Sequence, residues 1–262
     1  MKKNKSDYFH YNNVRLIKGG REYFELLEQM INEAQVSIHL QTYIFDEDET
    51  GLTIAEALIH AAERGVKVFV LLDAYGSQNF SGALISRFQK AGIFFRKFKP
   101  LFKSKSFFLG RRLHHKVLVV DCWRCTVGGI NISDRYNDTS QARAWLDWAL
   151  YAEGEVAPAL EKICKSYLRL RKKVASSFPE HRKPEQVCDV AIRLNDWLRG
   201  KRQIYYSYLR MFRDASSEII IMSAYFLPGR LFRKEIEKAA QRGIRIKVVL
   251  TGEADVYMIK FA

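Results

Sequence analysis

The 262-residue sequence lacks a long apolar run and has few cysteines and comparatively little negative charge. No apolar stretch approaches the roughly 18 residues that a membrane-spanning helix needs, and none follows the basic residues near the start of the chain. We therefore expect a protein that is either cytosolic or peripheral, at the cytoplasmic face of the cell membrane.

The four cysteines are Cys122, Cys125, Cys164 and Cys188. Because no secretory signal accompanies them, we expect thiols and not a disulfide framework. Cys122 and Cys125 form a C-x-x-C pair, but no second Cys or His pair follows at the spacing of zinc ligands. The pattern favours the lining of a hairpin over a metal or redox site.

Positive charge exceeds negative charge by 14, since 43 lysines and arginines stand against 29 aspartates and glutamates. Such an excess attracts polyanions, either nucleic acid or an anionic lipid surface. Hydrophobic residues make up 48% of the chain, which is enough for a folded core and argues against disorder.

The chain resembles itself at a distance of about 180 residues. Each copy has an amphipathic segment, a strand-like segment, and a helix that runs into AAERGVKVFVLL in the first copy and AAQRGIRIKVVL in the second. These segments are residues 23–31, 36–45 and 61–72, then 205–212, 218–228 and 239–250. A strand, a helix and a strand predict a parallel crossover, so we expect an α/β fold with a central mixed sheet flanked by helices.

The repeat also predicts how the chain is divided. The first copy with its chemical motif covers residues 1–170, a basic linker with two prolines covers 171–190, and the N-terminal part of the second copy covers 191–262. At the spacing of the repeat, a second motif would lie near residue ~290. We therefore expect the second repeat to be truncated.

The stretch LHHKVLVVDCWRCTVGGIN carries the residues suited to phosphate chemistry. In a strand, His114 and Lys116 project from one face and share a pocket. A neutral imidazole can attack phosphorus, while a lysine stabilises the developing oxyanion. Gly128 and Gly129 let the backbone pass close to a ligand and bring the amide of Asn131 near the pair. This set requires neither a metal nor a cofactor.

His114, Lys116 and Asp121 look like the HKD motif of the phospholipase D superfamily. From residue 16 to about 252, the surrounding sequence resembles bacterial cardiolipin synthases without their N-terminal transmembrane helices. The resemblance includes the segments TYIF, RGVKVFVLLDAYGS and AYFLPG. The resemblance implies that His114 is the nucleophile of a phosphohistidine intermediate, with Lys116 and Asn131 binding phosphate. Asp147 matches the acid that orients the histidine. Asp121 belongs to the motif, but its place on the opposite strand face favours a structural role.

Further candidate contacts lie outside the motif. Tyr43 and Tyr225 are expected as pocket walls that contact substrate. The segment RKFKPLFKSKSFFLGRR interleaves cations with aromatic rings, which is typical of a loop at a membrane surface. The expected membrane contacts are Lys99, Phe102, Lys103, Lys105, Phe107 and Phe108. The same mixture also suits base stacking and phosphate binding.

The resemblance implies a phosphatidyltransferase that passes a phosphatidyl group to phosphatidylglycerol. One half-site lacks the general acid, which the second motif or a dimer partner would supply, so we expect little synthase activity from this sequence. The alternative is a phosphodiesterase or nuclease that acts on nucleic acid, because some superfamily members carry one motif per chain and build the site by dimerisation.

Overall fold

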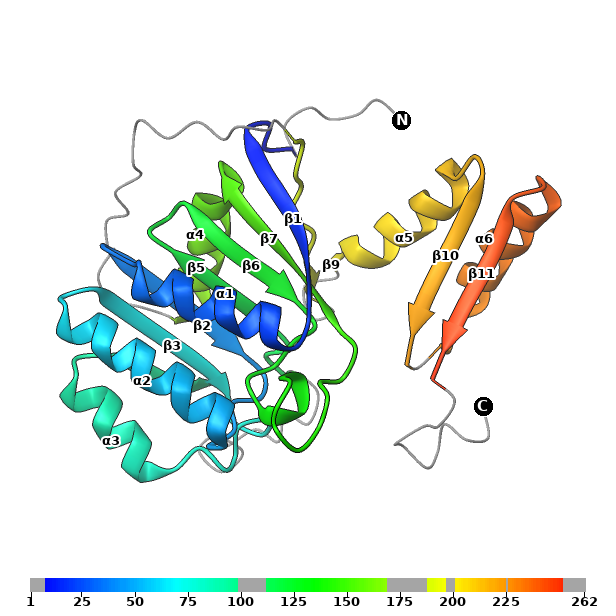
Figure 1. Cartoon of the computed structure of the whole chain (residues 1–262). Coiled ribbons are helices and arrows are strands. Elements are labelled where there is room, and N and C mark those ends of the chain that lie inside the picture. The colour runs from blue at the N-terminus through cyan, green and yellow to red at the C-terminus, as the bar shows by residue number, and fades with distance from the viewer. Residues whose placement is uncertain (1–7, 99–111, 169–187, 197–200, 225, 252–262) are drawn as a thin grey trace, which may run out of the picture. The chain divides into compact units, whose positions relative to one another are not determined.

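The computed structural model describes residues 8–98, 112–168, 188–196, 201–224 and 226–251. The chain divides into two compact units, Met1–Ile192 and Arg193–Ala262, each described here by itself (Figure 1). Within the described ranges, no helix is both long enough and apolar enough to cross a membrane.

The first unit is built on a sheet with the strand order β1-β7-β6-β5-β2-β3-β4. β2, β3 and β4 pair in parallel, whereas the pairings from β2 through β5, β6 and β7 to β1 are antiparallel. The predicted mixed sheet and the parallel crossover between β2 and β3 are therefore confirmed. The strands are β1 (Asn12–Lys18), β2 (Ser37–Thr42), β3 (Lys67–Asp73), β4 (Phe94–Phe98), β5 (Lys116–Val120), β6 (Arg124–Gly128) and β7 (Trp148–Gly154).

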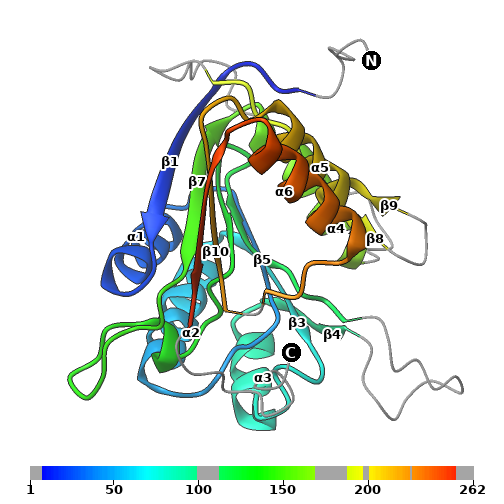
Figure 2. The same ribbon diagram turned by 90° about the vertical axis from the view of Figure 1, so that its right-hand side faces the viewer.

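Helices cover both faces of this sheet (Figures 1 and 2). α1 (Arg21–Asn32), α2 (Glu49–Glu63) and α3 (Gly82–Lys90) lie on one face, and α4 (Val156–Leu168) lies on the other. A short 3₁₀ helix, η2 (Asp134–Tyr136), follows β6. The side chains of Asp48 and Ser81 cap α2 and α3 by accepting a backbone N–H three residues on, which explains where these helices begin.

Strand β5 lies in the middle of the core and is buried on both sides. Leu118 and Val120 pack with the helices of the α1 side, while Val117 and Val119 pack against α4. This double burial explains why the strand is a continuous apolar run without polar alternation. Cys125 of β6 lies in the α4 cluster as a free thiol, and burial raises its pKa to about 12.

The predicted hairpin between β5 and β6 turns at Asp121 and Cys122, whose φ angles are 52° and 55°. An aspartate tolerates this left-handed conformation better than most residues do. The Asp121 carboxylate accepts the backbone N–H groups of Gln35, Val36 and Ser37 at 2.9, 2.7 and 2.9 Å. Asp121 thus ties the hairpin to the start of β2.

A buried charged group joins α4 to the sheet. Glu161 lies 3.3 Å from His39 Nε2 and 2.6 Å from Lys165 Nζ, and the side chains of both His39 and Glu161 are 1% exposed. Burial by itself would raise the pKa of Glu161, but favourable interactions with His39, Cys122 and Lys165 outweigh it and lower the pKa to about 2. The ionised carboxylate therefore stabilises the fold.

Replacing Glu161 with glutamine is expected to destabilise the first unit by on the order of 3 kcal/mol at pH 7. Because the folded-state pKa is lowered, the contribution of the charge is complete above the unfolded value of 4.5 and is lost as the pH falls toward about 2. The stability gap between the two proteins should therefore narrow by ~1 kcal/mol at pH 3.5, as measured by urea unfolding. Glu56→Gln, at an exposed pair with Arg87, is the control. An unchanged gap would contradict the prediction.

The second unit repeats the order helix, strand, helix, strand. Its elements are β8 (Asn195–Asp196), β9 (Lys201–Arg202), α5 (Gln203–Asp214), β10 (Glu218–Ser223), α6 (Arg230–Gln241) and β11 (Arg245–Leu250). β10 and β11 pair in parallel, as β2 and β3 do, and the buried residues Phe212, Ile219, Ala239 and Ile244 form its core.

The strand register differs by one residue from the sequence alignment of the repeat. Helices α1 and α5 begin 182 residues apart. Ile219, however, packs under the helices and pairs with Ile246, as Ile38 pairs with Val68. Strand β10 therefore corresponds to β2 at a distance of 181 residues. Because side chains alternate along a strand, this shift is needed to keep the apolar face toward the helices.

Candidate active site

His114 and Lys116 lie close together at the N-terminal end of β5. Lys116 is the first residue of the strand, where it pairs with Thr42, and His114 lies just before it. The Lys116 ammonium nitrogen is 3.1 Å from Nδ1 and 3.1 Å from Nε2 of His114. The Lys116 residue is buried, whereas His114 is exposed. The predicted pairing on one face is thus confirmed, and the imidazole is open to a ligand.

The pKa values of both His114 and Lys116 are lowered. Partial burial and the nearby Lys116 charge lower the pKa of His114, and Asp73 opposes this shift. Burial lowers the pKa of Lys116 to about 8, opposed by Asp147. At neutral pH the site therefore holds a neutral imidazole beside an ammonium group, which suits nucleophilic attack on an anionic phosphate.

Tyr43 forms a wall beside this pair. Its ring centroid is 5.0 Å from that of His114, and the Lys116 ammonium lies 5.5 Å from it in a cation–π contact. Burial and the negative charge of Asp73 raise the pKa of Tyr43, so its hydroxyl stays protonated. The structure therefore places Tyr43 beside the His114–Lys116 pair, and its contact with substrate stays a prediction.

Asn131 is held against the segment that carries Tyr43. Its Oδ1 accepts the backbone N–H of Ile44 at 3.1 Å, and its Nδ2 donates to the Tyr136 hydroxyl at 2.9 Å. The residue is 4% exposed. An amide nitrogen has two N–H groups, so one remains beyond the bond to Tyr136.

The two glycines before Asn131 are explained by the closeness of β7. A Cβ on Gly128 would lie 2.6 Å from the carbonyl oxygen of Trp148, and one on Gly129 would collide with the Asp147 carboxylate. At both positions, the segment that begins at Asp147 and continues into β7 leaves no room for a side chain. The sequence analysis explained these glycines by a nearby ligand instead. These glycines let Asp147 lie next to the site.

Asp147 acts on the lysine and not on the histidine ring. Its charge favours the protonated form of Lys116, and its Oδ1 accepts the backbone N–H of Trp148 at 2.7 Å. Among the described residues, no hydrogen bond joins Asp147 to His114. The expected orientation of the histidine ring by Asp147 is therefore not seen in this arrangement.

Other predicted residues are not brought to the site. Asp121 lies seven residues along the strand from His114, which is roughly 20 Å in an extended chain, and its carboxylate binds the backbone instead. This location supports the structural role and removes Asp121 from the catalytic set. Tyr225 and the six predicted membrane contacts between residues 99 and 108 lie outside the described residues.

The sequence reasoning missed Asp73, the last residue of β3. The carboxylate is completely buried and accepts the backbone N–H of Leu113, next to His114, at 2.8 Å. Arg112 Nη1 lies 4.0 Å from the same carboxylate, and its guanidinium stacks on the Tyr75 ring at 4.8 Å. A usable signal was present, because Asp73 is the single acid at the carboxyl end of an otherwise apolar strand.

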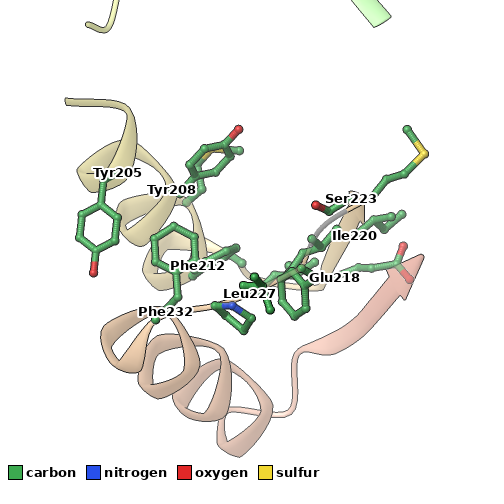
Figure 3. Close-up of a pocket in the computed structure, with 16 residues that line it drawn as sticks. Tyr205, Tyr208, Phe212, Glu218, Ile220, Ser223, Leu227 and Phe232 are labelled. Carbon is green, nitrogen blue, oxygen red and sulfur yellow. The ribbon is translucent and has the colours of Figure 1, made fainter. Parts of the chain in front are cut away.

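The second unit has an apolar cavity of about 640 Å³ between α5, β10 and the segment before α6 (Figure 3). Its walls include Tyr205, Tyr208, Phe212, Ile220, Leu227 and Phe232. Among the described residues that line this cavity there is no histidine, lysine or arginine, so phosphate chemistry is assigned to the His114 region. Within the described parts of the chain, no cluster of three or more His, Cys, Asp or Glu could hold a metal ion.

The sequence is similar to those of known proteins. Residues 27–147 match the family described as "Cardiolipin synthase, PLD-like domain". Cardiolipin synthase B of Escherichia coli (strain K12) is 33% identical over 257 residues, which are 95% of this chain and 62% of that protein. A cardiolipin synthase of Staphylococcus aureus (strain Mu50) is 30% identical over 254 residues, covering 93% of this chain and 51% of its own length.

A solved structure shows the same fold. Phosphatidylserine synthase of Haemophilus influenzae Rd KW20 superposes with a TM-score of 0.68 and 16% identity over 90% of this chain and 61% of its own. This chain thus spans somewhat less than two thirds of the cardiolipin synthase B that it matches. Residues 27–147 are thus similar to a phospholipase D-like domain, and the chain as a whole is similar in sequence to bacterial cardiolipin synthases.

Proposed function

We propose that this chain contributes a phosphatidyltransferase half-site of the cardiolipin synthase type, with His114 as the nucleophile. The observation that carries the proposal is the neutral, exposed imidazole of His114 held 3.1 Å from the Lys116 ammonium. The pair lies inside the segment that matches the cardiolipin synthase family. The sequence similarity to cardiolipin synthases favours a phospholipid substrate.

In the proposed reaction, a ring nitrogen of His114 attacks the phosphorus of phosphatidylglycerol. A bond forms between nitrogen and phosphorus as the bond to the glycerol oxygen breaks, and the departing glycerol takes a proton from a general acid. Lys116 and the remaining Asn131 N–H stabilise the charge on the phosphoryl oxygens. The hydroxyl of a second phosphatidylglycerol then gives its proton to the deprotonated general acid and attacks phosphorus, so the bond to His114 breaks and cardiolipin forms.

The general acid is proposed to come from a second HKD motif or from a dimer partner. Losing such an acid typically costs 10² to 10⁴-fold in rate, so this chain alone should turn over natural lipids slowly. A p-nitrophenyl ester avoids this difficulty, because its leaving group departs without being protonated.

The test therefore compares two phosphodiesters with the same leaving group. Phosphatidyl-p-nitrophenol in mixed micelles is expected to release a burst of p-nitrophenolate equal to the protein concentration, and to leave acid-labile phosphate on the protein. Thymidine 5′-p-nitrophenyl phosphate should react much more slowly. A burst with the nucleotide alone would establish the nucleic acid alternative, and no burst with either ester would refute the assignment of His114.

A further inference from the structure

Asp73 connects the backbone segments that surround the site. Its Oδ2 accepts the N–H of Leu113 at 2.8 Å, and its Oδ1 accepts the N–H groups of Tyr75 and Gly76 at 2.9 and 3.1 Å. One carboxylate thus holds both the turn after β3 and the residue before His114. With three backbone donors and no exposed surface, it is fixed in place.

The same turn also holds the segment that carries Tyr43. Ser77 donates its backbone N–H to the Asp73 carbonyl at 3.0 Å and its hydroxyl to the Tyr43 carbonyl at 2.9 Å. The Ser77 hydroxyl oxygen accepts the N–H of Phe45 at 3.0 Å. The chain positions of Tyr43 and His114 are therefore set through one hydrogen-bonded turn that begins at Asp73.

We propose that Asp73 is a positioning residue for His114, whose carboxylate fixes the backbone at Leu113 and so sets the imidazole against Lys116 and Tyr43. This proposal rests on the proposed role of His114 as nucleophile. Asp73 does not touch the substrate, and it acts through the segment that His114 follows.

The buried negative charge of Asp73 is compensated by several neighbouring groups. A buried carboxylate loses its hydration, so its surroundings must compensate for this loss, and Arg112 at 4.0 Å is an imperfect partner. The rest of the compensation comes from three N–H dipoles and from the positive potential of the site. In return, the negative charge of Asp73 opposes the effect of Lys116 on the pKa of His114.

Asparagine at position 73 separates the two functions of the carboxylate. The asparagine Oδ1 can still accept the N–H groups of Tyr75 and Gly76, which preserves the turn. Its NH₂ group then faces the N–H of Leu113, so donor meets donor and only the bond next to His114 is lost.

The test is an NMR titration of the His114 Cε1–H signal in Asp73→Asn, which needs no substrate. The pKa of His114 should fall below that of the parent chain, because the charge that raises it is gone. The burst rate with phosphatidyl-p-nitrophenol should fall about 10- to 100-fold. The matched control is Asp121→Asn, which loses a carboxylate that also accepts three backbone N–H groups but lies at the far end of β5.

The outcomes separate positioning from mere stability. The Asp121→Asn control should lower the unfolding midpoint and leave the His114 titration unchanged. If Asp73→Asn behaves in the same way, the proposal is overturned. Should Asp73→Asn fail to fold, Arg112→Met replaces it: the less compensated Asp73 charge should raise the pKa of His114, and an unchanged titration would refute the proposal. A shifted titration without any burst in the parent chain would instead count against the proposed function alone.

Discussion

The His114→Asn variant is expected to lose the p-nitrophenolate burst by on the order of 10³-fold or more. Asparagine has no basic nitrogen, so no bond to phosphorus can form, although Lys116 and Asn131 remain to bind the phosphate. Binding of the lipid ester should therefore survive while the chemical step disappears. The measurement is a stopped-flow burst at saturating ester, combined with phosphate analysis of the acid-treated protein.

The neighbouring histidine offers a matched control for this experiment. His115 faces the other side of the chain, where its Nδ1 lies 3.0 Å from Gln41 Oε1 and its ring packs on Tyr167 at 4.8 Å. The His115→Asn variant should keep its burst, provided that its folded fraction is checked by circular dichroism. A burst that persists in His114→Asn would show that another residue is the nucleophile.

The Lys116→Met variant should reduce the burst rate by about 10² to 10³-fold, since a cation that stabilises the transition state is removed. Methionine preserves most of the length of the side chain in its buried site. Because Lys116 lowers the pKa of His114, the pKa of His114 should rise in this variant. A larger fraction of the imidazole should therefore be protonated at pH 6. An NMR titration of His114 measures this change without substrate.

The pH dependence of the burst rate should reflect the lowered pKa values of both His114 and Lys116. The parent chain needs a neutral His114 and a charged Lys116, so its burst rate per ester concentration should rise through the lowered pKa of His114 and fall above about pH 8. In Lys116→Arg the guanidinium stays charged, and the alkaline fall should vanish even if the rate is lower throughout. An alkaline fall at the same pH in Lys116→Arg would assign it to another group.

Local periodicity predicted part of the first unit. Helix α1, the strands β2 and β3 and the parallel crossover between these strands follow from rules that involve neighbouring residues. The pairing of His114 with Lys116 could be predicted for the same reason, because two residues in one extended segment share a face.

What could not be predicted depends on contacts between distant segments. Asp73 is 41 residues before His114, and only the folded sheet, in which β2 lies between β3 and β5, shows that its carboxylate binds Leu113. Likewise, the approach of β7 to Gly129 is invisible in the sequence, so the glycine was assigned to a ligand and not to Asp147. The one-residue shift in β10 was hidden because two isoleucines stand side by side at Ile219 and Ile220.

The pairing of β1 with β7 has a consequence for synthesis of the protein. Asn12 pairs with Gly154, and the N–H of Gly19 donates to the Asp147 carbonyl, so the first strand waits for residues made more than a hundred positions later. Contacts so distant in sequence form slowly. A nascent chain that has emerged only through Asn131 would lack β7, so β1 would still be without the strand that it pairs with.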